Sequence, residues 1–170
     1  MTKSLLDDAF GHHVWATLRL TDACLELTPE QLETTVPGTY GSILNTMRHI
    51  VAGDSFDLYV LNGERAHLVD ANRMGLAELA ATMERNGEAW SRLLARDLDP
   101  AAVVREVDPD DGYQRDATVG IRLAGTLQHG TEHRSHVCTT FTALGVQPPR
   151  IDVFDFGLLD GRVVEVLPQS

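Results

Sequence analysis

The segment from Gln128 to His136 holds three histidines within eight residues. His129 and His133 are four residues apart, and residues at this spacing lie on the same face of an α-helix. Their imidazole nitrogens could therefore bind one metal ion. Two ligands rarely hold a divalent ion firmly, and His49, in another helical segment, is the candidate for the third. Three protein ligands and an open position are typical of a catalytic metal site rather than a structural one.

The same spacing has a simpler interpretation. Any helix edge can carry two histidines four residues apart, and the chain uses histidine freely, as the pair His12-His13 and His67 show. On that interpretation the three histidines are ordinary residues of a helix surface. Imidazole suits zinc, nickel, copper and iron, so the ligand type alone does not select the ion. Zinc and nickel are the ions that we expect.

Four long helices are expected to position these residues. Apolar side chains recur at helical spacing over residues 5–27, 42–62, 76–96 and 119–144. Ser42 is a suitable N-cap, and glycines at positions 63 and 145 mark helix ends. With a long connection over residues 64–73, this pattern predicts an all-α protein, a four-helix bundle with a long crossover connection.

The remaining segments are shorter. Residues 103–107 read as a strand, and residues 114–118 could return beside it as a small β-hairpin before the last long helix. A short helix is expected over residues 153–159. Residues 1–170 show no internal repeat or linker, so a single domain is expected.

Composition restricts the partners. The formal net charge is −11 and the basic residues are scattered, which argues against nucleic acid and anionic membranes as partners. No segment is long and apolar enough to span a bilayer, and the first ten residues lack the apolar region of a signal peptide. A cytoplasmic protein that binds a small molecule is therefore expected. Cys24 and Cys138 are interpreted as free thiols in apolar surroundings.

The chain resembles the DinB/YfiT-like superfamily of small bacterial four-helix bundles. The resemblance covers almost the whole chain and is carried by three places. Trp15 follows the pair His12-His13 in the opening helix. Residues 42–50 (SILNTMRHI) are similar to the stretch that carries the first metal ligand of the family, and residues 129–136 (HGTEHRSH) resemble its His-x-x-x-His-Arg pattern.

This resemblance implies that three residues are the metal ligands: His49, His129 and His133. It also implies a homodimer that pairs through helix faces. The chain departs from the family pattern at Glu132, where a further histidine is frequent, at Ser135, where glycine is usual, and at His136, where glutamine is common. The ligands are untouched by these departures, but their neighbours differ.

Three functions are compatible with such a site. By resemblance, the first is thiol-dependent S-transferase or isomerase chemistry with a low-molecular-weight thiol such as mycothiol or bacillithiol. The second is a hydrolase in which the metal lowers the pKa of bound water. The third is a dimer that binds a metal or small ligand without turnover. No catalytic residue is assigned; Asp54, Asp57 and His136 are only candidates for a general base.

Other residues are given mainly structural roles. Trp15 and Trp90 are expected to pack between helices, and His12 and His13 to lie on a helix surface. Arg134 should point away from an ion bound by its neighbour and form a salt bridge or a dimer contact, because adjacent helix residues diverge by about 100°. Tyr40, in a loop, could reach the mouth of the site.

Overall fold

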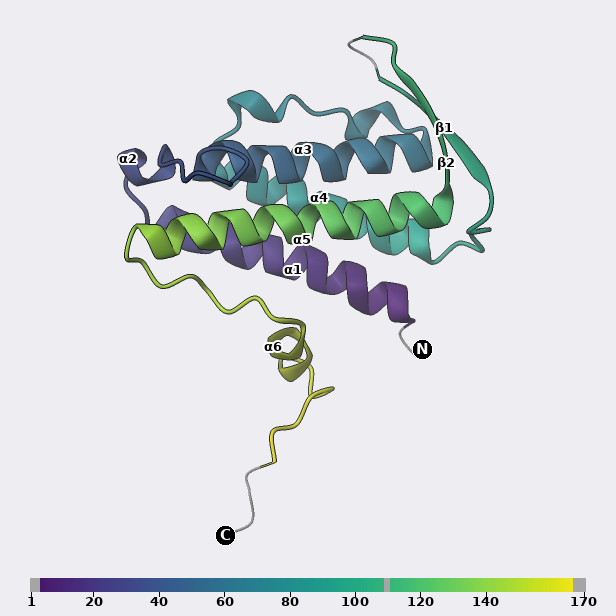
Figure 1. Ribbon diagram of the computed structural model, residues 1–170. Coiled ribbons are helices and arrows are strands. Elements are labelled where there is room, and N and C mark those ends of the chain that lie inside the picture. The colour runs from purple at the N-terminus through teal and green to yellow at the C-terminus, as the bar shows by residue number, and fades with distance from the viewer. Residues whose placement is uncertain (1–3, 109–110, 167–170) are drawn as a thin grey trace.

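The computed structural model describes residues 4–108 and 111–166. Four long helices form a bundle (Figure 1): α1 (Leu5–Leu25), α3 (Ile43–Asn62), α4 (Leu76–Leu94) and α5 (Val119–Ala143). Helices α1 and α3 each pack against both α4 and α5. The predicted all-α bundle is confirmed, and these helices begin and end within two residues of the expected positions.

Local hydrogen bonds and a glycine explain where the helices begin and end. The hydroxyl of Ser42 accepts a hydrogen bond from the backbone N–H of Asn45, and the hydroxyl of Thr118 accepts one from Ile121. These side chains satisfy N–H groups that have no partner within the first turn of a helix. Gly63 ends α3 with a φ of 72°, a left-handed conformation that glycine adopts without strain.

The connections contain the smaller elements. Strands β1 (Val103–Val107) and β2 (Gln114–Thr118) pair antiparallel with Val103 opposite Thr118, so the predicted hairpin is confirmed. Thr118 both ends β2 and caps α5, so the hairpin leads directly into that helix. The described residues also contain four short helical segments: α2 (Pro29–Leu32), η1 (Arg65–His67), η2 (Ala71–Arg73) and α6 (Val153–Leu158).

The core consists of two apolar clusters. One includes Leu20, Met47, Ile50, Met83 and Phe141, and the other includes Phe10, Leu58, Trp90 and Leu123. In each long helix, a buried polar residue lies between the residues of one cluster and those of the other. These polar residues include His13, Asp54, Asn86 and Arg134. Trp90 is fully buried as expected, whereas Trp15 is half-buried and packs against Phe156 of α6.

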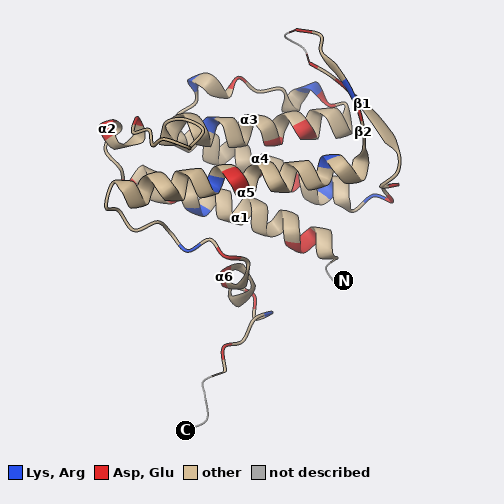
Figure 2. Cartoon of the chain, viewed as in Figure 1, with Lys and Arg blue, Asp and Glu red and all other residues tan. Residues whose placement is uncertain are grey.

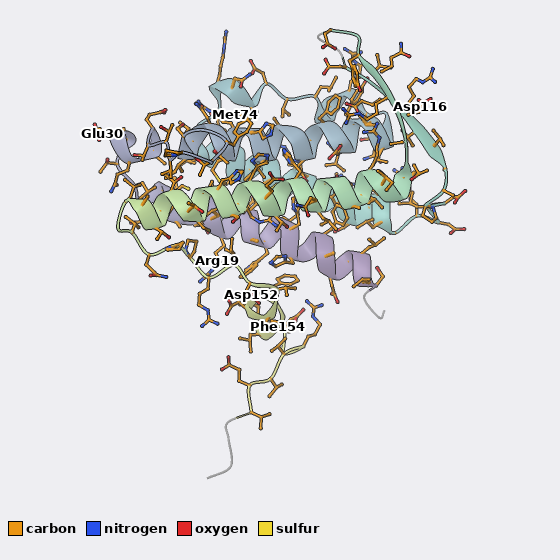
Figure 3. The ribbon with its side chains drawn as sticks, viewed as in Figure 1. Arg19, Glu30, Met74, Asp116, Asp152 and Phe154 are labelled. Atoms are coloured by element: carbon orange, nitrogen blue, oxygen red, sulfur yellow. The ribbon has the colours of Figure 1, made fainter. Side chains whose placement is uncertain are left out.

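The segment after α5 returns along α1. Nε2 of His12 donates to the carbonyl oxygen of Ile151 over 2.8 Å, and Nε of Arg19 donates to that of Arg150 over 2.9 Å. Figure 3 shows Arg19 on this side of the bundle and Asp152 and Phe154 on the α6 segment beyond it. His12 is therefore half-buried rather than a free surface residue.

Charges are dispersed over the described surface, with basic and acidic residues interspersed on the helices and the hairpin (Figure 2). None of the described helices is long and apolar enough to cross a membrane. Cys24 is buried and Cys138 half-buried, and both are free thiols, as predicted.

Candidate metal centre

Three histidines from two helices meet at the contact between α3 and α5. One nitrogen each of His49, His129 and His133 lies within 4.8 Å of the others. Nε2 of His49 and Nε2 of His129 are 2.9 Å apart. The ring centroids are separated by 4.5–4.7 Å, and the rings meet edge to face. The structure thus brings together the three residues that the sequence singled out.

The position of the His129 ring depends on a glycine of α3. Gly53 lies one turn after His49 on α3 and faces the ring of His129. A Cβ atom at position 53 would lie 2.7 Å from Cε1 of His129, closer than side chains tolerate. Glycine inside a helix costs about 1 kcal/mol relative to alanine. Its presence in the middle of α3 is a sequence signal for such a contact, which our sequence analysis missed.

Tyr40 closes one side of the cluster. Its ring stacks on His49 with a centroid distance of 4.0 Å and an interplanar angle of 13°, and it meets His133 edge to face at 4.9 Å. The predicted position of Tyr40 at the mouth of the site is confirmed. With 52% of its surface exposed, Tyr40 limits the rotation of His49 while leaving the cluster accessible.

The cluster favours neutral imidazoles. The pKa of His129 is lowered to about 4, mainly by burial and in addition by unfavourable charge interactions with the neighbouring His49 and His133. Burial is also the main cause that lowers the pKa of His49 and of His133. At neutral pH the rings therefore carry free lone pairs, the form in which imidazole binds a metal ion.

The donor set fits a divalent transition metal. Nδ1 of His133 is buried and has no hydrogen-bond partner in the described part of the chain. Such unsatisfied buried nitrogens cost free energy unless something else binds them. Around a tetrahedral ion, metal–nitrogen bonds of about 2.0–2.1 Å place the nitrogens roughly 3.3 Å apart. This lies between the 2.9 Å that separates Nε2 of His49 from Nε2 of His129 and the 4.8 Å within which all three nitrogens fall. His49, His129 and His133 would hold this ion and leave a coordination position open.

A second polar group lies deeper, around Asp54. This carboxylate accepts hydrogen bonds from the ring N–H of Trp90 over 2.9 Å and from the amide of Asn86 over 2.7 Å. Nε2 of His13 lies 2.9 Å from Oδ1 of Asp54. Both oxygens are engaged and the residue is 1% exposed, so Asp54 is a structural residue and was wrongly considered as a general base.

Arg134 extends this network, which corrects two expectations. Its guanidinium donates to Nδ1 of His13 over 3.0 Å and to the hydroxyl of Thr17 over 3.2 Å. Because arginine only donates, Nδ1 accepts and Nε2 of His13 must donate to Asp54. His13 and Arg134 are thus core residues, whereas a surface position and a salt bridge or dimer contact were expected. Gly130 makes room for them, since a Cβ there would overlap the His13 ring.

The other two base candidates differ in position. The ring of His136 lies 5.3 Å from that of His133, and His136 is not part of the three-histidine group. Asp57 lines a cavity of about 350 Å³ that also contains His129 in its wall. Thr126 donates to Oδ2 of Asp57 over 2.7 Å. Asp57 thus shares an accessible cavity with a residue of the histidine cluster.

Comparison with known proteins agrees with the resemblance described above. No curated protein matches the chain at a significant level. The DinB family model matches residues 1–159, a range that includes all four long helices and the three clustered histidines. The protein is a member of the DinB family.

Proposed function

We propose that the protein is an enzyme that binds a divalent transition metal, zinc or nickel, at His49, His129 and His133. The observation that carries this proposal is the meeting of three imidazole nitrogens within 4.8 Å, from rings whose lowered pKa values keep them neutral. Nδ1 of His133 is buried without a hydrogen-bond partner among the described residues, while His49 and His129 are hydrogen-bonded to each other. A shared cation would bind a nitrogen of each of the three rings.

We further propose that the reaction is a thiol-dependent transfer or isomerisation of a small molecule. A divalent ion in such a site acidifies the thiol or water that takes its open position. The thiol must come from outside the chain. Cys24 is buried, burial raises its pKa to about 12, and neither cysteine belongs to the histidine group.

The residues of the chain have defined tasks in this scheme. The three imidazoles bind the ion as neutral ligands. Tyr40 stacks on His49 and fixes the orientation of that ring, while Gly53 leaves the space that the ring of His129 occupies. The cavity beside His129 is large enough for part of a small substrate.

Elemental mass spectrometry tests the metal site. We expect near-stoichiometric zinc or nickel in wild-type protein and in His67→Ala, which changes a histidine outside the cluster, and loss of the metal in His129→Ala. Circular dichroism should show the same helix content in all three. No metal in any of them, even after incubation with zinc and nickel, would contradict the proposal.

A second measurement separates the two enzyme types. Cobalt(II)-loaded protein should develop a sulfur-to-metal charge-transfer band when 2-mercaptoethanol is added, which reports a thiol at the open position. Metal binding without this band, together with hydrolysis of a simple ester, would instead indicate a hydrolase.

A further inference from the structure

The cavity beside His129 connects the histidine cluster with a carboxylate. It lies between α3, α5 and the hairpin, and its wall includes His129, Thr126 and Asp57. On α3, His49, Gly53 and Asp57 follow one another at intervals of four residues and therefore share a face. Because position 53 has no side chain, no Cβ separates His129 from the turn that carries Asp57.

Asp57 is held with one oxygen available. The hydroxyl of Thr126 donates to Oδ2 over 2.7 Å and so fixes the carboxylate. Within the described residues, Oδ1 has no hydrogen-bond partner. This differs from Asp54, one turn earlier on the helix, whose two oxygens are both engaged.

The other charged groups around Asp57 do not neutralise it. Arg122 of α5 lies 2.9 Å from Glu106 of β1 and forms a buried ion pair with it. Arg115 of β2 is exposed and 3.9 Å from the same glutamate. The pKa of Asp57 is raised to about 6, mainly by burial; Asp54 and Glu106 contribute to the rise, and Thr126 and Arg122 oppose it. A carboxylate of this pKa is a stronger base than an ordinary one and is still ionised at pH 7.

We propose that Asp57 is a catalytic residue that accepts the proton of the thiol bound at the histidine cluster. This inference rests on the proposed thiol-dependent function. The S–H bond of the incoming thiol breaks, its electron pair stays on sulfur, and the proton passes to Oδ1 of Asp57. Thr126 keeps the carboxylate oriented through Oδ2. After release of product, the proton leaves to solvent through the same cavity.

The rate at which a thiol binds tests this role. Cobalt(II)-loaded protein is mixed with 2-mercaptoethanol in a stopped-flow instrument, and the sulfur-to-metal charge-transfer band is followed between pH 5 and 8 in wild type, Asp57→Asn and Asp22→Asn. Asp22 is exposed on α1, so Asp22→Asn removes the same charge far from the cavity. We expect about 10²-fold slower binding in Asp57→Asn at pH 7.5, as for the loss of a general base.

The pH profile and the metal content exclude a merely structural effect. The wild-type rate should rise through a pH of about 6, Asp57→Asn should lack this inflection, and the cobalt content of the three proteins should be equal. In metal-free wild-type protein, ¹³C NMR should show a carboxyl titration with a midpoint near 6 that is absent from Asp57→Asn.

The outcomes distinguish a failure of the role of Asp57 from a failure of the proposed thiol-dependent function. Equal rates and profiles in wild type and Asp57→Asn, with the band formed in both, would overturn the role of Asp57 and leave the thiol chemistry intact. A midpoint of the Asp57 carboxyl near 4 would also overturn it. Absence of the band in wild type would overturn the thiol function, and the role of Asp57 with it.

Discussion

Two groups of polar side chains meet at neighbouring turns of α3 and α5, one closed by further residues of α1 and α4 and one open. In the closed group, Asp54 and His13 have partners at both of their polar side-chain atoms and are almost fully buried. In the open group, the clustered histidines face one another, and Asp57 has one free oxygen within the described residues. The same residue types thus serve stability in one group and are left available for chemistry in the other.

The difference shows how a function can be located without knowledge of a substrate. Buried polar groups in native proteins are almost always satisfied. A group of neutral imidazoles beside a carboxylate of raised pKa departs from that rule, and perturbed pKa values concentrate at functional sites. Removing a residue should therefore destabilise the closed group and should cost the open group ligand binding rather than stability.

The largest effect is expected in the closed group. Asp54→Ala should lower the free energy of unfolding by about 3–5 kcal/mol, because loss of one member of a buried charged network leaves the others without partners. Urea denaturation of the metal-free protein measures this. Asp22→Ala, at an exposed position, should change it by less than about 0.5 kcal/mol. A loss below about 1 kcal/mol for Asp54→Ala would remove the distinction between the groups.

Asp57→Asn should have the opposite effect and increase the free energy of unfolding. The pKa of Asp57 is about 6 in the folded protein against a reference of 3.8. Between these pH values the folded state binds more protons than the unfolded state, so stability falls as the pH rises. Asparagine removes this penalty and should stabilise the metal-free protein by about 1–3 kcal/mol at pH 7.5, with little gain at pH 4.

Urea denaturation of Asp57→Asn and wild type at both pH values measures the gain. A destabilised variant at pH 7.5 would mean that Asp57 belongs with the structural aspartate and not with the open group.

Gly53→Ala should weaken the open group specifically. The added methyl displaces the ring of His129, and we expect about 10–100-fold lower zinc affinity, as for other changes beside metal ligands. Gly125→Ala on α5 is the matched control, since a Cβ there meets no atom within 4 Å. Competition with a chromophoric chelator measures both. Wild-type affinity in Gly53→Ala would show that this close approach does not matter.

The smallest effect is expected in the pH dependence of the free energy of unfolding of the metal-free protein. The pKa of His129 is about 4 in the folded protein and 6.5 as a reference, so the unfolded state binds more protons between these values and stability rises with pH across them. In His129→Ala this rise should be shallower by no more than about 1 kcal/mol, because solvent screens the half-buried ring. Denaturation at pH 4.5 and 7 measures the rise. The prediction would be contradicted if the increase in stability between pH 4.5 and 7 were the same in His129→Ala as in wild type but different in His67→Ala.

The sequence predicted most of the fold because its signals are local. Capping by Ser42 and termination at Gly63 are decided within one helical turn, so the ends of α3 could be predicted. The histidine spacing is local as well, whereas His49 was linked to the pair on α5 only as a candidate from another helix, which the resemblance supported. The closed group could not be predicted, because His13, Asp54 and Arg134 come from three helices and become partners only in the packed bundle.

The distance along the chain between His49 and His129 means that a metal bound to both would also affect stability. The two residues are 80 positions apart, so an ion that joins them closes a loop of that length. In an unfolded chain, closing such a loop costs about 4–5 kcal/mol of chain entropy. An ion that requires both helices therefore binds the folded chain far better than the unfolded one. The concentration of available metal would then determine the stability of the folded protein as well as its activity.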